Sequence, residues 1–285
     1  LSSGLVDVAT ARWRRWRAPT TGTTRPAGER RHCVITGAAD GIGRALAEAA
    51  AAAGYAVTGI DIDRARAQQV QTALTARGHE FHFIEADLAV LDALPALVDT
   101  LAQRSPIDLL IHNAGISDVG PFCASNLARQ RAVLDVNLCA PLLLNAELLG
   151  NAALTADATI VFLSSLSHFT GYPGAALYAA TKDGLASYAR SLAVAVAPQR
   201  QHVLTVFPGP TRTAHARRYS PDNRREARRM APQVLAQQIL QAVHAHRRIL
   251  IPGPTNRAAA LLGQLLPTVA EQLMRRTIYD KLRRR

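Results

Sequence analysis

The sequence predicts a doubly wound α/β fold, a single domain whose mostly parallel seven-stranded sheet has helices on both faces. Three observations predict it. Short apolar segments alternate with longer helical segments from residue 32 to residue 252, and this alternation is typical of parallel sheets. Apolar residues make up 48% of the 285-residue chain, enough for a sizeable core. A glycine-rich turn joins the first expected strand to the first expected helix.

The expected elements follow from apolar periodicity and from the glycines and prolines that punctuate it. The expected strands are His32–Thr36, Tyr55–Asp61, Glu80–Ala86, Ile107–His112, Ala158–Leu163, His202–Phe207 and Arg248–Ile251. The expected helices are Arg44–Ala53, Arg64–Arg77, Leu91–Gln103, Leu127–Leu149, Ala176–Val196 and Gln233–His246. Pro141 lies inside the fourth helix and predicts a kink or local break there.

The net charge of +12 divides the chain into three parts. We expect a basic N-terminal extension and linker at 1–31, the α/β domain at 32–252, and a basic amphipathic helical tail at 253–285. Charge sums to +5 over residues 1–32, −4 over 33–216 and +11 over 217–285. Basic ends can contact anionic lipid, nucleic acid or an acidic protein, although simple solubilising charge is the favoured interpretation. No nucleic-acid-binding signature is present, so no nucleic acid is expected.

The two ends carry apolar residues among their arginines. Within Ala258–Met274 apolar residues recur at helical spacing, and Pro267 predicts a break into two helices. This stripe suits packing on the domain or on a subunit partner, which we favour, or a membrane surface. Trp13 and Trp16, set among arginines, suit an interfacial anchor, a partner-binding segment or a cloning remnant.

Cysteine usage indicates a reduced, cytoplasmic protein with no metal site. Cys33, Cys123 and Cys139 are odd in number and show no metal-binding or redox spacing. No apolar run is expected to be long enough to span a bilayer. The sequence therefore favours a cytoplasmic protein with, at most, peripheral membrane association.

The turn after the first strand has the pattern of a dinucleotide site. It contains Gly37, Asp40, Gly41, Ile42 and Gly43 and leads directly into a helix. Glycines permit a tight turn and a close backbone approach to a pyrophosphate, while the helix N-terminus offers unpaired N–H groups. The pattern predicts a Rossmann-type NAD(P) site.

An acidic residue at the end of the second strand favours NAD over NADP. Asp61 follows Gly43 by eighteen residues and can accept hydrogen bonds from the adenosine ribose while repelling a 2′-phosphate. Asp40 adds a second negative charge. Arg64 and Arg66 weaken this inference, because either could reach a 2′-phosphate.

A serine, a tyrosine and a lysine follow the fifth expected strand. Tyr178 comes thirteen residues after Ser165, and Lys182 is four residues further along one helix face. A nearby ammonium, together with the positive nicotinamide ring, is expected to lower the pKa of the tyrosine, so that it could exchange a proton with a carbonyl or alcohol oxygen. Ser165 would hydrogen-bond that oxygen. Only Lys182 and Lys281 are lysines in this arginine-rich chain, which strengthens the pairing.

Over roughly residues 32–252 the chain resembles the classical short-chain dehydrogenase/reductase family. The matching segments, in order, are Thr36–Gly43, Asp87-Leu88, Asn113-Ala114-Gly115, Asn137, Ser165, Tyr178-Ala-Ala-Thr-Lys182 and Pro208-Gly-Pro-Thr-Arg-Thr213. The resemblance implies that Asn137 completes a catalytic tetrad by holding a relay water. It also implies that Asp87 and Leu88 contact adenine, that Asn113, Ala114 and Gly115 border the cofactor, and that Pro208, Gly209 and Thr213 lie along the nicotinamide. His112 and Asp40 depart slightly from the family pattern.

These features predict an oxidoreductase that moves a hydride between NAD(P) and a secondary alcohol or ketone. Substrate side chains are expected from Leu166–Pro173, from Asp118–Phe122 and from the segment after Thr213, and the apolar residues of the first two suggest a hydrophobic substrate such as a lipid, sterol or hydroxyacyl compound. The resemblance implies a homodimer or homotetramer. The alternative is a protein without turnover on the same fold, either a nucleotide sensor or a membrane-surface lipid-binding protein; an intact tetrad argues against it.

Overall fold

The computed structural model describes residues 23–24, 28–104, 106–120, 126–220, 222–224 and 226–282. Several residues with predicted roles lie outside the described ranges. They are Trp13 and Trp16 of the predicted anchor, Phe122 of the predicted substrate surface, Cys123, and the last three arginines of the basic tail.

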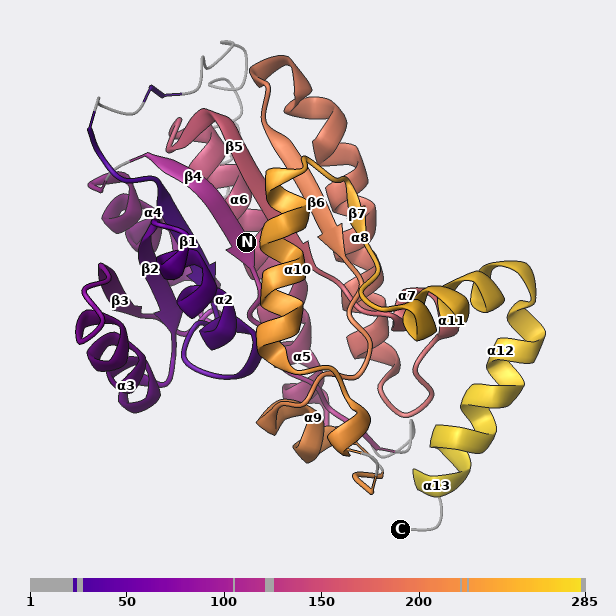
Figure 1. The fold of residues 1–285 in the computed structure, drawn as a ribbon. Coiled ribbons are helices and arrows are strands. Elements are labelled where there is room, and N and C mark those ends of the chain that lie inside the picture. The colour runs from indigo at the N-terminus through magenta and orange to yellow at the C-terminus, as the bar shows by residue number, and fades with distance from the viewer. Residues whose placement is uncertain are drawn as a thin grey trace, which may run out of the picture.

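A seven-stranded sheet, parallel throughout, forms the centre of the molecule (Figure 1). Its order is β3-β2-β1-β4-β5-β6-β7, which confirms the predicted doubly wound fold. The strands are β1 (His32–Thr36), β2 (Ala56–Asp61), β3 (Phe81–Glu85), β4 (Ile107–His112), β5 (Leu154–Leu163), β6 (His202–Val206) and β7 (Ile249–Leu250). Strand β5 begins four residues earlier than predicted, because Leu154 pairs with Ile107 before the register shifts.

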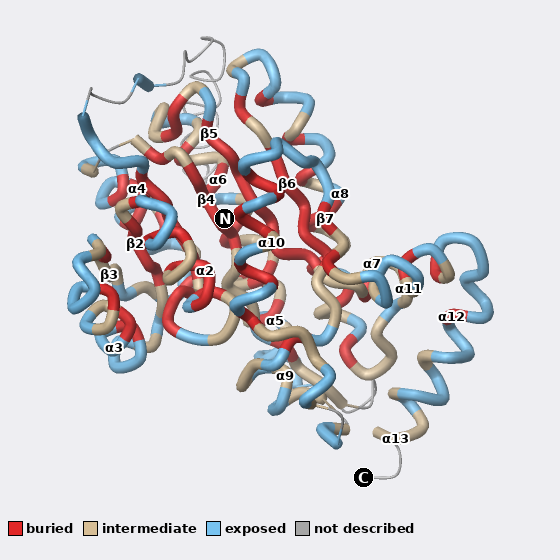
Figure 2. The backbone as a smooth tube through the Cα atoms, viewed as in Figure 1, coloured by how far each residue is buried: buried red, intermediate tan, exposed pale blue. Residues whose placement is uncertain are grey.

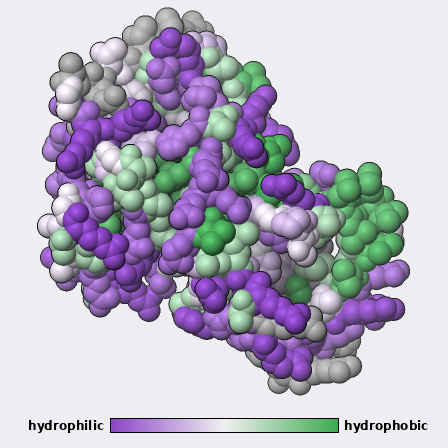
Figure 3. Space-filling model, in the orientation of Figure 1, coloured by the Kyte–Doolittle hydropathy of each residue, from purple (hydrophilic) through white to green (hydrophobic). Residues whose placement is uncertain are grey.

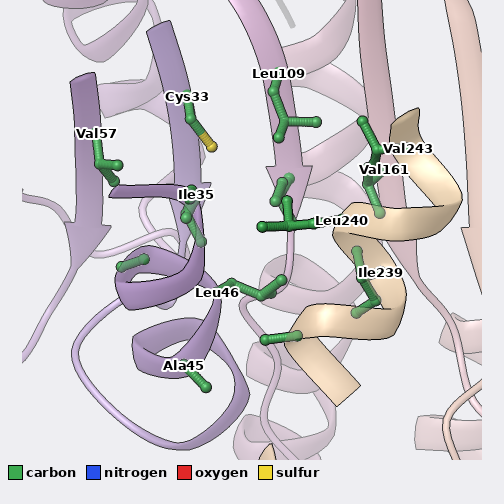
Figure 4. Packing of buried hydrophobic residues seen from close by; sticks show 14 of the residues in the cluster. Cys33, Ile35, Ala45, Leu46, Val57, Leu109, Val161, Ile239, Leu240 and Val243 are labelled. Atoms are coloured by element: carbon green, nitrogen blue, oxygen red, sulfur yellow. The ribbon is translucent and has the colours of Figure 1, made fainter. Parts of the chain in front are cut away.

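Helices cover both faces of the sheet, and each face has its own apolar core (Figure 2). On one face lie α2 (Gly41–Ala52), α3 (Arg64–Thr75) and α10 (Pro232–His244). Figure 4 shows Leu46 of α2 and Ile239 of α10 beside Leu109 and Val161 of the sheet. The other face carries α4 (Leu94–Ala102), entered through the 3₁₀ turn η2 (Leu91–Ala93), together with α6 (Ala140–Gly150) and α8 (Ala176–Ala195).

The helix predicted at 127–149 is divided by a π turn. It consists of α5 (Leu127–Leu134), the π segment η4 (Asp135–Cys139) and α6. Pro141 lies in the first turn of α6, where its missing N–H costs little, and the π turn just before it absorbs the break in helical hydrogen bonding. The predicted irregularity at Pro141 is therefore confirmed.

The helical stretch Leu127–Gly150 is also long and apolar enough to cross a membrane by length and composition, with a mean hydropathy of 1.5. The expectation that no run reaches that length was wrong for this stretch. Half of the apolar window is buried inside the protein, where the helix packs against α4 and α8. The buried half of these apolar residues therefore belongs to the protein core.

Short helical elements connect the longer ones in the second half of the domain. In chain order, α7 (Ser167–Thr170) follows β5, η5 (Ala197–Gln199) joins α8 to β6, and α9 (Ala214–Tyr219) and η6 (Glu226–Arg228) follow β6. The polar stretch predicted at 211–229 thus contains two short helical turns. We call residues 211–229 the lid segment.

The tail forms an arm that projects from the domain (Figure 1). It comprises α11 (Pro254–Leu265), α12 (Pro267–Met274), the π segment η7 (Arg275–Tyr279) and α13 (Asp280–Leu282). The predicted break at Pro267 is confirmed, since Leu266 separates two helices there. We call residues 254–282 the C-terminal arm.

Candidate active site

The glycine turn between β1 and α2 has no room for side chains at its key positions. Gly37 and Gly41 have φ angles of +67° and +55°, in the left-handed region that favours glycine. A Cβ on Gly43 would overlap the carbonyl oxygen of Gly37, and one on Gly37 would lie 2.9 Å from the Ala114 Cα. The N-terminus of α2 thus stays open to a close-lying phosphate group, as a dinucleotide requires.

Asp61 reaches back from the end of β2 to the glycine turn. One carboxylate oxygen accepts a hydrogen bond from the Ala39 N–H at 2.9 Å, and the other accepts from the Asp63 N–H at 3.0 Å. A carboxylate has further lone pairs, so Asp61 can still accept from ribose hydroxyls. The structure therefore brings this acid beside the glycine turn, where the sequence predicted it.

Asp40 is exposed and has local partners. Its carboxylate accepts from the Gly41 N–H at 2.8 Å and pairs with the Arg66 guanidinium at 3.2 Å. Arg64 pairs instead with Glu85 at 3.5 Å. Arg66 offsets the negative charge of Asp40, so Asp40 discriminates against a 2′-phosphate less than the sequence suggested.

The residues after β4 hold the turn in place. The Asn113 side-chain amide donates to the carbonyl oxygens of Thr36 and Gly37, both at 2.9 Å. The Thr36 hydroxyl accepts from the N–H groups of Asn113 and Ala114, both at 3.1 Å. Asn113 therefore shapes the cofactor site through the turn it supports.

Asp87 and Leu88 differ in their surroundings after β3. The Asp87 carboxylate accepts from the Ala89 N–H at 2.9 Å and so caps a local turn, while Leu88 is buried against the core. The cap does not use every lone pair of the carboxylate, so an adenine contact remains open to Asp87.

Tyr178 and Lys182 lie on one face of α8, as predicted. The Lys182 Nζ is 5.7 Å from the centre of the Tyr178 ring and donates to the Leu163 carbonyl oxygen at 2.9 Å. Ser165, just past the end of β5, hydrogen-bonds the Tyr178 hydroxyl. The structure thus gathers the three predicted catalytic residues at the carboxyl end of the sheet.

Burial opposes charge on both members of this pair. It raises the pKa of Tyr178 to about 12, and the Ser165 hydrogen bond lowers that pKa only in part. Burial also lowers the pKa of Lys182 to about 8. Desolvation is therefore the dominant influence on the Tyr178 pKa within the protein, and the lowering expected from the Lys182 ammonium together with a positive nicotinamide ring stays a prediction. At neutral pH the phenol of Tyr178 is protonated.

Asn137 lies within the π turn η4 and is fully buried. Its side chain accepts from the Ile116 N–H at 2.8 Å and donates to the Ile116 carbonyl oxygen at 2.9 Å. A Cβ on Gly115 would lie 3.2 Å from Lys182 Nζ and 3.4 Å from Asn137 Oδ1, so both side chains border this glycine. The fourth predicted tetrad residue is thus close to Lys182.

The segment after β6 carries Pro208, Gly209 and Thr213. The Pro208 carbonyl accepts from the Leu166 N–H at 2.9 Å, which ties this segment to the one after Ser165. Thr213 caps α9, and its methyl group would lie 3.1 Å from a Cβ on Gly41. The lid segment therefore starts directly over the glycine turn.

Two residues near this segment had no signal in the sequence. A Cβ on Gly209 would overlap the side-chain amide of Asn256, which places the first turn of the C-terminal arm beside the expected nicotinamide position. The second is His215 of α9. Desolvation, followed by the positive charge of the nearby Lys182, lowers the pKa of the His215 imidazole to about 4. Neither belongs to a local motif, so only the fold brings them to the site.

His112 lies behind the site. Its ring stacks on Phe162 with centroids 4.9 Å apart, and burial lowers its pKa to about 3. A neutral, buried imidazole at this place supports β4 and takes no visible part in proton transfer. Among the residues that the structure describes, no group of three His, Cys, Asp or Glu side chains could hold a metal.

Of the apolar residues expected around the substrate, Tyr172 lies nearest the tyrosine. Its ring meets the Tyr178 ring edge-on, with centroids 6.3 Å apart. Phe169 packs instead against Phe207 and the arm residue Gly263, so it supports the site from outside.

Comparisons with known proteins agree with this geometry. The family model "short chain dehydrogenase" matches residues 31–224. The cis-4-hydroxycyclohexanecarboxylate dehydrogenase of Sinomonas cyclohexanicum is 33% identical over 63% of this chain and 72% of its own length. The 3-oxoacyl-[acyl-carrier-protein] reductase FabG of Aquifex aeolicus is 34% identical over 62% of this chain and 72% of its own length.

Solved structures give the same answer for the fold. The bulky-bulky ketone specific alcohol dehydrogenase of Comamonas testosteroni is 25% identical, with a TM-score of 0.71 over 84% of this chain and 93% of its own. Other similar structures contain NADPH, NADP or NAD. The chain belongs to the short-chain dehydrogenase/reductase family, whose members are NAD(P)-dependent oxidoreductases acting on hydroxyl and keto groups.

Proposed function

We propose that the chain interconverts a secondary alcohol and its ketone, with Tyr178 as the general acid or base. The observation that carries the proposal is the Tyr178 hydroxyl, bonded to Ser165, with Lys182 on the same helix face beside the glycine turn. A bound nicotinamide dinucleotide would supply or accept the hydride. Gly37, Gly41, Ile42 and Gly43 would hold its pyrophosphate, and Asp61 its ribose.

Each catalytic residue has a role that follows from its surroundings. Ser165 would hydrogen-bond the substrate oxygen and stabilise its developing charge. Tyr178, protonated at neutral pH, would donate its proton to that oxygen during reduction of a ketone. Lys182 and Asn137 would then return a proton through the space beside Gly115.

We infer NAD as the preferred cofactor, with NADP less favoured. The position of Asp61 beside Ala39 supports this preference, because a 2′-phosphate would meet its negative charge. The remaining predicted contacts, from Asp87, Leu88, Asn113, Ala114, Gly115, Pro208, Gly209 and Thr213, are proposed to follow the family arrangement.

We propose a hydrophobic substrate, of the lipid, sterol or hydroxyacyl kind, handled by a cytoplasmic homodimer or homotetramer. Tyr172 beside Tyr178 supports an apolar substrate surface. Leu127 and Val194, on α5 and α8, expose large apolar side chains, which supports a subunit contact through these helices. We also propose that the chain consists of a basic N-terminal extension at 1–31, a catalytic domain at 32–252 and a basic helical tail at 253–285.

The test is a screen of secondary alcohols and ketones, including sterols and hydroxyacyl compounds, followed by NADH absorbance. Tyr178→Phe is the matched control, since it removes only the hydroxyl. We expect turnover of at least one hydrophobic compound, a loss of at least about 100-fold in kcat in Tyr178→Phe, and unchanged NADH binding in that variant. Full activity in Tyr178→Phe would sink the mechanism. NADH binding with no turnover of any compound would favour the alternative, a nucleotide sensor.

A second observation favours peripheral contact with an anionic membrane. Leu261, Leu265, Leu266, Val269 and Leu273 are 49% to 68% exposed along the arm, and Figure 3 shows this apolar surface at its outer side. Arg257 precedes this ridge and Arg275 and Arg276 follow it, all exposed, which suits anionic headgroups.

Co-sedimentation with vesicles of phosphatidylcholine and phosphatidylserine tests the membrane contact. We expect the full chain to sediment, and a chain ending at Gly253 or a Leu265→Gln/Leu273→Gln variant to stay in solution. Sedimentation of all three would contradict a role for the ridge. A dimer that the double variant splits would assign the ridge to a second copy instead.

A further inference from the structure

The C-terminal arm touches the rest of the chain at its base and again at its tip. At the base, a Cβ on Gly263 would overlap the Phe169 carbonyl, so the α11 backbone lies directly on α7. At the tip, Leu282 contacts the backbone of Gly174, and the Lys281 ammonium pairs with the Asp222 carboxylate at 3.0 Å. The arm is therefore held at both ends, on segments that flank Tyr178 in the chain.

A chain of contacts leads from the tip of the arm to the Tyr178 ring. Asp222 belongs to the lid segment, where the Arg229 guanidinium donates to its carbonyl oxygen at 3.0 Å. The same guanidinium faces Tyr172 and moderates the rise in its pKa. Tyr172 in turn meets the Tyr178 ring edge-on.

The arm tip also contacts the loop that precedes α8. Gly174 lies in this loop, four residues before Tyr178, and its carbonyl accepts from the Gly120 N–H at 2.9 Å. Leu282 packs on this glycine, whose φ of +110° and close neighbour both exclude a side chain. Loop, lid segment and arm tip are thus connected to one another, and through Tyr172 to the Tyr178 ring.

The π turn in the arm orients its last residues. Ala270 is buried and Met274, Ile278 and Leu282 are half-buried, whereas Val269 and Leu273 are exposed. A spacing of four residues drifts around an ordinary α-helix, but the wider π turn at Arg275–Tyr279 offsets this drift. An apolar stripe that starts at Ala270 therefore stays on the inner side until Leu282.

The charged contact at the tip uses one of only two lysines in the chain. The Asp222 carboxylate also accepts hydrogen bonds from the Arg224 guanidinium and from the Arg224 backbone N–H, and these hydrogen bonds together with that of Lys281 lower its pKa strongly. Asp222 is thus ionised at any pH where the protein would act.

We propose that Leu282 and Lys281 determine substrate specificity: the arm folds back on its own subunit, the Lys281–Asp222 pair fixes it, and Leu282 contacts an apolar extension of the substrate beyond the reacting carbon. This inference rests on the proposed alcohol–ketone chemistry. It adds that the far wall of the substrate site comes from the tail, outside the part of the chain that carries the family motifs.

The kinetic test compares two ketones of different length, butan-2-one and undecan-2-one, with NADH. We expect the wild type to prefer undecan-2-one in kcat/KM. Leu282→Ala should lower that preference about tenfold through KM, because it removes most of one half-buried aliphatic side chain. Lys281→Gln should lower it about threefold, as expected for a partly exposed ion pair, and Lys281→Arg should retain it.

Matched variants separate this role from general destabilisation. Leu273→Ala makes the same change on the exposed face of the arm and should leave the preference as in the wild type. Asp222→Asn should lower the preference at least as much as Lys281→Gln, because it also removes the Arg224 pair, and the double variant should add nothing to Asp222→Asn, because the Lys281 contact is then already lost. An unchanged preference in Leu282→Ala, or additive effects of Asp222→Asn and Lys281→Gln, would overturn the proposal.

A second readout does not need turnover. Hydrogen–deuterium exchange of the peptides covering 171–177 and 276–282 should speed up together in Lys281→Gln and stay as in the wild type in Arg276→Gln. If the wild type reduces neither ketone but this exchange coupling is present, the choice of substrate fails and the arm contact stands. If exchange at 171–177 does not respond, the arm contact itself is refuted.

Discussion

Different interactions shape the cofactor side and the substrate side of the site: backbone packing on the first, and ion pairs between side chains on the second. Around the glycine turn the shape is set by backbone packing: Gly43 lies against Gly37, and the Asn113 amide binds two carbonyl oxygens behind them. Around the lid segment and the arm tip, side-chain charges converge on Asp222 near the surface. Backbone packing gives one fixed shape, whereas partly exposed ion pairs can be rearranged at little cost in stability. This difference suits a constant cofactor and a variable substrate.

The largest expected effect comes from filling the packed glycine turn. In Gly43→Ala the new methyl group overlaps the Gly37 carbonyl, and we expect a loss of about 2 kcal/mol in the free energy of unfolding together with at least about tenfold weaker NADH binding. Chemical denaturation and fluorescence titration measure both. Gly150→Ala is the matched control, because its Cβ would meet open space. Equal behaviour of the two variants would contradict the packed turn.

The next effect tests the buried lysine through pH. Because burial lowers the Lys182 pKa to about 8, the ammonium is present below pH 8 and is lost as the pH rises through that value. The positive charge stabilises the phenolate that Tyr178 becomes after proton donation, so kcat/KM for ketone reduction should fall about tenfold per pH unit above 8. Lys182→Arg, slower but always charged, should show no such fall. The same midpoint in both proteins would assign it to another group.

A smaller effect concerns the choice of dinucleotide. Asp61→Asn removes one negative charge beside Ala39 and should reduce the preference for NADH over NADPH about tenfold in Kd. Asp63→Asn makes the same change two residues later, where asparagine can still cap α3, and should leave the ratio unaltered. Comparable affinities for the two dinucleotides in the wild type would refute the role of Asp61.

The smallest effect is expected on the substrate side. Asp222→Asn should change Tm by no more than about 3 °C, since its ion pairs are partly exposed. Differential scanning calorimetry beside Gly43→Ala makes the comparison direct. A larger loss of stability in Asp222→Asn than in Gly43→Ala would reverse the contrast between the two sides.

Local patterns made the doubly wound fold and the residues of the proposed cofactor side predictable. The glycine turn, Asp61 and the Tyr178–Lys182 pair each lie within one strand–helix unit, so spacing alone places them. The early start of β5 could not be foreseen, because it depends on pairing between Leu154 and Ile107. The rise in the Tyr178 pKa could not be foreseen for a similar reason, since desolvation depends on everything packed around the ring.

The substrate side had no comparable signal. Asn256 beside Gly209, Gly263 on Phe169 and Lys281 with Asp222 are all contacts between segments far apart in the sequence. No periodicity predicts which glycine of the tail will meet which carbonyl. Lys281 stands out in the sequence as one of two lysines in an arginine-rich chain, but only the fold shows that its partner is Asp222.

The strand order also has a consequence for synthesis on the ribosome. After β1, the strands β2 and β3 are added outward on one side, and β4 to β7 follow in sequence on the other. Every new strand therefore finds its neighbour already made, and the sheet can grow as the chain emerges. The contacts of Lys281 and Leu282 form after all of these, so a ribosome would complete the dinucleotide side of the protein before it closes the substrate side.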